Sequence, residues 1–143
     1  MAPGDDIYAV IDRALHLSPL DMTSVSALFD VPLTHTPDPG NPYIRILVAE
    51  IPEPSPVQRL ELRVPAEGTG TALLILTTRS NGAVPIATLR SRYGPPVRVE
   101  GPRAAAPLGT PTYETYEGAW GRLTFGFLPA EKNALREIII ERK

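Results

Sequence analysis

The sequence predicts an α+β fold, a single domain over residues 1–143 in which N-terminal helices cover one face of an antiparallel meander sheet. Apolar residues near the N-terminus recur at helical spacing, whereas several later apolar runs alternate with polar residues, as half-buried strands do. The 17 prolines are excluded from helix interiors and central strands, so they divide the chain into short elements. With 143 residues, 43% of them hydrophobic, the chain can bury one core.

Two helices are expected before any strand, over residues 6–17 and near residues 23–30. The first has apolar residues on one face at helical spacing: Ile7, Val10, Ile11, Ala14 and Leu15. A polar side chain at the start of each helix can accept hydrogen bonds from its first N–H groups. The candidate caps are Asp5 or Asp6 for the first helix, and Thr23 or Ser24 for the second.

Three strands are expected next, over residues 43–51, 57–64 and 72–78. The middle one alternates, with an inward set of Leu60, Leu62 and Val64 and an outward set of Arg59, Glu61 and Arg63. Residues 72–78 are apolar almost throughout, which indicates a central strand covered on both faces.

The second half of the chain begins with a helix over residues 85–93 that ends at Gly94. A long loop to Pro111 follows, and then strands over residues 112–117, 119–128 and 135–142. The inward face of the middle strand is expected to consist of Leu123, Phe125 and Phe127.

The succession of elements suggests an internal repeat of residues 23–80 and 85–143, each a helix–loop–three-strand unit. An offset of 64 residues places Phe29 over Tyr93 and Pro32 over Pro96. The alternative is that two unrelated pieces agree by chance.

Residues 86–142 carry a hydrophobic pattern, with Leu89, Tyr93, Gly94, Pro96, Tyr113, Tyr116, Trp120, Phe125, Phe127 and Ile138. A short helix, the turn Arg-Tyr-Gly-Pro-Pro and a three-stranded meander resemble the unit of β-lactamase-inhibitory-protein-like folds. They also resemble the outer-membrane assembly lipoproteins of the SmpA/OmlA type. Residues 23–78 match less well, with Asp30 where glycine is expected. The resemblance implies a small α+β fold that binds other proteins.

The composition argues against chemistry at a reactive site. There is no cysteine, and the two histidines, His16 and His35, have no spacing typical of a zinc site. Glycine-rich residues 67–70 lack the lysine and the following helix of a phosphate-binding loop. We therefore expect no enzyme activity, no cofactor and no metal.

The charge and hydropathy of the chain bear on its partners and its location. A net charge of -2 does not favour nucleic acid or an anionic membrane. No apolar run approaches the roughly 20 residues that span a bilayer. The first residues do not resemble a signal peptide, so we expect a cytoplasmic protein, or a periplasmic one if a signal peptide was removed.

The most concentrated unusual segment, at residues 112–120, is aromatic and acidic, as protein interfaces often are. Alternation along a strand places Tyr113 and Tyr116 on opposite faces, so at least one of them is expected in the core. The expected partner-binding residues are Tyr113, Glu114, Tyr116, Glu117 and Trp120, together with Arg92 and Arg98.

The sequence thus favours a non-catalytic inhibitor or immunity-type protein that masks a partner protein such as a toxin, an enzyme or an envelope component. The alternatives are a periplasmic envelope assembly or structural factor and, third, a secretion chaperone.

Overall fold

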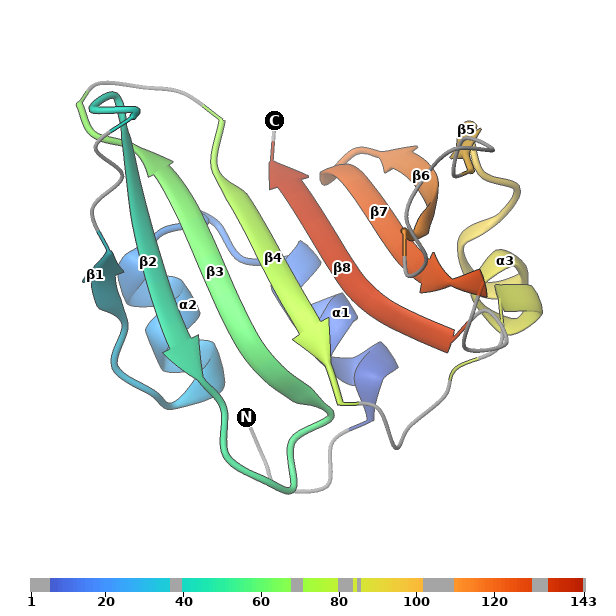
Figure 1. Ribbon diagram of the computed structural model, residues 1–143, viewed down its shortest axis with the longest axis horizontal. Helices are drawn as coiled ribbons and strands as arrows, with labels where there is room; N and C mark the ends of the chain where they lie inside the picture. Colours follow the sequence, from blue (N-terminus) through green and yellow to red (C-terminus); the bar gives the residue numbers. More distant parts are fainter. Residues whose placement is uncertain are drawn as a thin grey trace.

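An antiparallel sheet with helices on one side is the framework of the protein, seen in a computed structural model (Figure 1). The structure describes residues 6–36, 40–67, 71–79, 84, 86–101, 110–129 and 134–142. Within this part of the chain the helices are α1 (Ile7–Leu15), α2 (Met22–Phe29) and α3 (Ile86–Tyr93). The strands of the same part are β1 (Thr34–Thr36), β2 (Ile44–Glu50), β3 (Val57–Pro65), β4 (Leu73–Thr78), β5 (Arg98–Glu100), β6 (Thr112–Gly118), β7 (Gly121–Leu128) and β8 (Ala134–Arg142). The predicted α+β class is therefore correct.

All eight described strands form one sheet, in the order β1-β2-β3-β4-β8-β7-β6-β5. Each half of the chain is a meander of four antiparallel strands, and the last strands of the two halves, β4 and β8, pair at the centre (Figure 1). In that central pair Ile75 lies opposite Ile139. The two meanders thus share one continuous ladder of backbone hydrogen bonds.

The three helices pack on the same face of the sheet, where the core lies. Figure 1 shows α1 and α2 behind the strands, and α3 is tied to this face by contacts between Arg90 and the inward side chain of Glu114. Fully buried side chains come from both layers: Val10, Ile11, Ala14, Val25 and Leu89 from the helices, and Leu60, Leu62, Leu74, Leu76, Leu123, Phe125, Ile138 and Ile140 from the sheet. Burial of this apolar surface is the main term that holds the layers together.

The alternation expected in two strands is confirmed. In β3, Leu60 and Leu62 point into the core, and Val64, expected with them, is only half-buried against it. In β7, Leu123, Phe125 and Phe127 point into the core. The expectation for β4 was only half right. It is a central strand, but its burial alternates, with Leu74 and Leu76 buried and Leu73 and Ile75 only half-buried, because no helix covers the other face.

The helix ends follow from local hydrogen bonds. The carboxylate of Asp6 accepts from the N–H of Ala9 at 2.8 Å, as expected for a cap of α1. The cap of α2 is Asp21 instead of Thr23 or Ser24; Asp21 and Ser24 exchange side-chain-to-backbone hydrogen bonds at 2.9 and 3.1 Å. Ser24 is therefore the second member of the capping box and not the cap itself.

Two short edge strands, β1 and β5, lie where sequence reasoning expected loop. Each has three residues, all exposed, so neither produces an alternating pattern of hydrophobicity. Ser80-Asn81-Gly82, whose residue types predict a turn, and most of the predicted loop before Pro111 lie outside the described residues.

Candidate protein-binding surface

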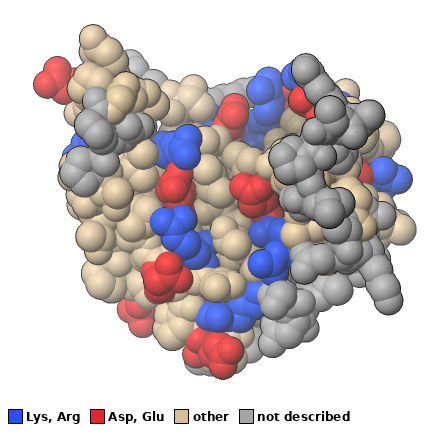
Figure 2. Space-filling model, in the orientation of Figure 1, with Lys and Arg blue, Asp and Glu red and all other residues tan. Residues whose placement is uncertain are grey.

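The face of the sheet opposite the helices is the candidate functional site, and we call it the open face. It consists of the strand residues that alternate with the core residues. Those considered below are Ile44, Ile46, Val48, Glu50, Arg59, Glu61, Arg63, Leu73, Ile75, Arg98, Glu100, Tyr113, Thr115, Glu117, Arg122, Glu137, Ile139 and Glu141. Figure 2 views the molecule from this side and shows basic and acidic side chains interspersed across the middle of the face.

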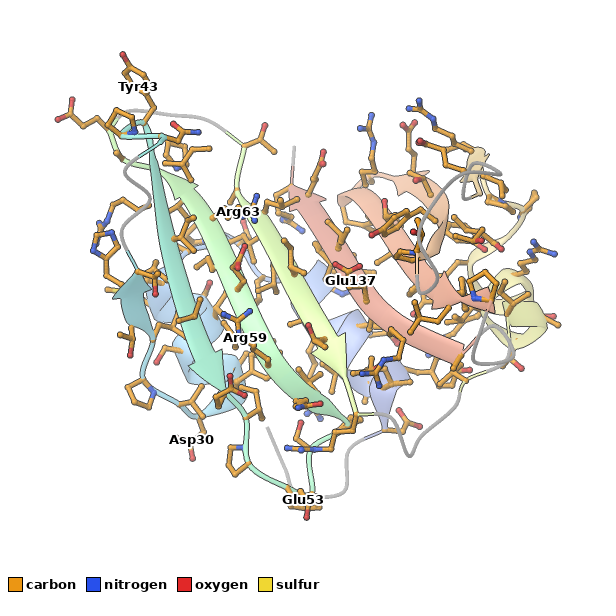
Figure 3. All side chains as sticks on the ribbon, in the orientation of Figure 1. Asp30, Tyr43, Glu53, Arg59, Arg63 and Glu137 are labelled. Carbon is orange, nitrogen blue, oxygen red and sulfur yellow. The ribbon has the colours of Figure 1, made fainter. Side chains whose placement is uncertain are left out.

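On the β2–β3 side of the open face, the charges form a chain of ion pairs. Arg59 lies 3.4 Å from Glu50 across the strands and 3.8 Å from Glu61 along its own strand. Arg63 donates to the other oxygen of Glu61 at 2.6 Å. Arg59 and Arg63 both extend over the sheet in Figure 3. Exposed pairs of this kind contribute little to stability, but they hold long side chains in one arrangement.

A second group of polar contacts covers the β6–β7–β8 side. Arg122 lies 3.4 Å from Glu117 and 3.7 Å from Glu141. The hydroxyl of Tyr113 donates to Glu137 at 3.0 Å. Burial is the main cause that raises the pKa of Tyr113 to about 12, and the carboxylate of Glu137 is the second. The phenol therefore stays protonated at neutral pH.

Half-buried aliphatic side chains share the open face with the two groups of charges. Ile46 and Val48 of β2, Leu73 and Ile75 of β4, and Ile139 of β8 all point to the open face. Apolar side chains bordered by arginines and carboxylates in ion pairs are typical of the contact surfaces between proteins.

Two hollows mark the open face, and they share Glu141. The larger, of about 570 Å³, lies where β2, β3, β4 and β8 meet at one end of the sheet. Its walls are Tyr43, Ile44, Val64, Pro65, Thr71 and Leu73, with Arg63, Glu67 and Glu141 as charged members. The smaller, of about 320 Å³, lies over β5–β8 and includes Arg98, Glu100, Tyr113, Thr115, Glu117 and Arg122.

The structure separates the predicted partner-binding residues into four groups. Tyr113, Glu117 and Arg98 lie on the open face and line the smaller hollow. Arg98 also lies 2.9 Å from Glu100 of the same edge strand. Trp120 lies in the β6–β7 turn, with its ring against Gly118. For these residues the prediction of a binding role stays a prediction.

Glu114 and Tyr116 cannot serve as surface contacts, because they are only 1% and 2% exposed. The carboxylate of Glu114 accepts two hydrogen bonds from Arg90 of α3, at 2.9 and 2.8 Å, and one from the hydroxyl of Tyr116 at 3.3 Å. Burial raises the pKa of Tyr116 to about 12, with Glu114 as the next cause. Arg90 thereby anchors α3 to the sheet.

Arg92 lies on the helix side of the molecule, away from the open face. Its guanidinium donates to Asp12 of α1 at 2.9 Å and lies 4.9 Å from the ring centre of Tyr8. This contact joins α3 to α1, so Arg92 has a packing role in the structure. No spacing in the sequence indicated that residues 12 and 92 would meet.

Among the described residues, neither histidine lies in a cluster of reactive side chains. Nδ1 of His16 lies 2.6 Å from the carbonyl oxygen of Asp12, and His35 is exposed in β1. In the described part of the chain, no three His, Cys, Asp or Glu side chains are grouped so that they could hold a metal ion. None of the described helices is long and apolar enough to cross a membrane.

No protein-family model, curated protein or solved structure matches the chain. The function is therefore argued from the open face itself.

Proposed function

We propose that the protein is a non-catalytic protein-binding domain, of the inhibitor or immunity type, that masks a partner protein with the open face of its sheet. The observation that carries the proposal is the face itself. It spans both meanders and combines half-buried aliphatic side chains with arginines held by carboxylates.

The energetics of the open face favour a protein partner. Aliphatic side chains such as Ile75 and Ile139 lose only part of their contact with water on folding, so a partner that covers them gains hydrophobic free energy. Arginines that already lie in ion pairs lose less conformational freedom when they bind. A broad face with these two properties suits a protein surface better than a small substrate.

We further propose that residues 23–80 and 85–143 are copies of one unit, similar to the unit of the β-lactamase-inhibitory-protein-like and SmpA/OmlA-type folds. Asp30 and Gly94, 64 residues apart, end α2 and α3 with left-handed backbone, at φ of 53° and 86°. Ion pairs of 3.4 Å join the second and third strands of both meanders, Glu50–Arg59 in one and Glu117–Arg122 in the other. With β1 and β5 included, each unit has four strands.

The location that fits this role best is the cytoplasm, where an immunity-type protein meets its partner. The periplasm is the alternative.

A comparison of two surface variants tests the binding role. Tagged wild-type protein is expected to retain a stoichiometric partner from a native lysate, and Ile75→Arg is expected to lose it because it places a charge at the centre of the open face. Ala27→Arg, at an exposed position of α2, is the matched control and should retain the partner.

Both variants should first show the circular dichroism and melting temperature of a folded protein. The proposal is refuted if no partner is retained by the wild type, or if the control loses the partner while Ile75→Arg keeps it.

A further inference from the structure

We propose that the larger hollow is the anchor of the open face and receives an aliphatic or aromatic side chain of a partner protein, presented next to a lysine or arginine. We call it the anchor hollow; it is the 570 Å³ hollow bounded by Tyr43, Ile44, Pro65 and Leu73. This inference rests on the proposed function and names the place and chemistry of the main contact.

The walls of the anchor hollow suit an apolar side chain. Ile44, Pro65 and Leu73 supply aliphatic surface from three neighbouring strands. Tyr43, which is 81% exposed, projects beyond the end of the sheet at its rim (Figure 3). An exposed tyrosine beside an apolar hollow is typical of binding hot spots, because its ring covers a large area at small entropic cost.

The charges at the rim favour a basic neighbour for that side chain. Arg63 is held by Glu61 at 2.6 Å, whereas Glu67 forms no ion pair with any described residue. Glu141 has only a long contact of 3.7 Å, with Arg122. The carboxylates of Glu67 and Glu141 are therefore available to a lysine or arginine of the partner. A second copy of the same face would instead bring like charges together, so it is the weaker occupant.

Most of the walls of the hollow come from the first half of the sheet, which gives the partner one orientation. Pairing in the sheet places Leu73 opposite Arg63 in the first meander, and Glu137 opposite Gly126 in the second. Glu137 thus occupies the position that Leu73 has in the first meander, and it accepts a hydrogen bond from the hydroxyl of Tyr113. This position is therefore polar in the second meander and apolar in the first. Figure 3 shows Arg63 and Glu137 on the two sides of the centre of the sheet.

A defined peptide tests the inference on the intact protein. The probe is acetyl-Lys-Tyr-Lys-amide, titrated into isotopically labelled protein while the amide resonances are followed by NMR. We expect saturable shifts centred on Ile44, Glu67 and Leu73. Acetyl-Glu-Tyr-Glu-amide should bind at least about tenfold more weakly, because each close charge pair changes from attraction to repulsion.

Two matched variants give the location. Leu73→Lys fills the hollow with a cation and should abolish the shifts, whereas Ala27→Lys places the same cation at an exposed position of α2 outside the open face and should leave peptide affinity within about twofold of wild type. Equal binding of the two peptides, equal effects of the two variants or an absence of saturable shifts would overturn the inference.

The anchor and the proposed function can fail separately. If a partner retained through the open face binds Leu73→Lys as tightly as wild type, the anchor is wrong and the binding function stands. If no partner depends on the open face, the function itself fails. Concentration-dependent dimerisation that Leu73→Lys abolishes would assign the hollow to a second copy and also overturn the inference.

Discussion

Three consecutive isoleucines in β8 provide a sharp test of which face of the sheet is uncovered. Ile138 and Ile140 are fully buried under the helices, whereas Ile139 between them is half-buried on the open face. We consider the change of each one to alanine in turn. Because residue type, strand and chemical change are the same, the three variants differ only in the face that they perturb.

The expected losses follow from burial. Ile→Ala removes three carbon groups, worth about 0.8 kcal/mol each when fully buried, and the cavity that remains adds about 1 kcal/mol, so each buried site should lose about 3–4 kcal/mol. Ile138 lies opposite Leu76 and Phe125, and Ile140 opposite Leu74 and Leu123, so neither cavity can collapse easily. For Ile139 the transfer term is roughly halved and no closed cavity forms, which predicts a loss of about 1 kcal/mol.

Urea unfolding followed by far-UV circular dichroism and by fluorescence of Trp120, the single tryptophan, measures these free energies. The m-value should stay constant across the set. A loss at Ile139 as large as those at its neighbours would mean that something covers the open face. That result would refute the argument for a binding surface. Small losses at Ile138 and Ile140 would refute the assignment of the core face.

Further predictions follow from single sites. Gly121→Ala should lower the free energy of unfolding by at least about 2 kcal/mol, because φ is 129° and the new methyl group would lie 2.1 Å from the carbonyl oxygen of Glu141; wild-type stability in urea would contradict this. Asp30→Gly should raise the melting temperature, with a gain of about 0.5 kcal/mol, because Asp30 has left-handed backbone at φ 53°; a lower melting temperature would contradict it. The free energy of unfolding should keep its full value below about pH 10 and fall as the pH rises toward 12. The reason is that the tyrosines of the unfolded chain ionise at a lower pH than those of the folded protein. Phenolate absorbance of the folded protein should then show three groups that titrate near pH 12, which are Tyr93, Tyr113 and Tyr116.

The order of the helices and the inward faces of β3 and β7 could be predicted from the sequence because they follow from local periodicity. A period of two in residues 57–64 assigns Leu60 and Leu62 to one side whatever the rest of the chain does. The C-terminal end of α2 was harder to predict from the sequence, because Asp30 occupies a left-handed position that glycine usually fills.

The candidate site was less accessible to sequence reasoning. Glu114 sits in an aromatic and acidic segment that is typical of a surface, yet it is buried because Arg90, 24 residues earlier, meets it from α3. The hollow beside Leu73 combines residues from four strands that are joined only by tertiary pairing. Neither the Arg90–Glu114 contact nor the hollow produces a recognisable pattern within one segment of the sequence.

The sequence by itself determined the α+β class, the short elements and most of the core residues of β3 and β7, because these depend on proline positions and on the period of apolar side chains. Only the tertiary structure decided that β4 pairs with β8, that the three described helices share one face and that none of them covers the other face. The physical reason is that backbone hydrogen bonds between strands are the same for any sequence. The sequence of an apolar strand such as β4 therefore does not indicate which strand pairs with it or whether its second face is covered.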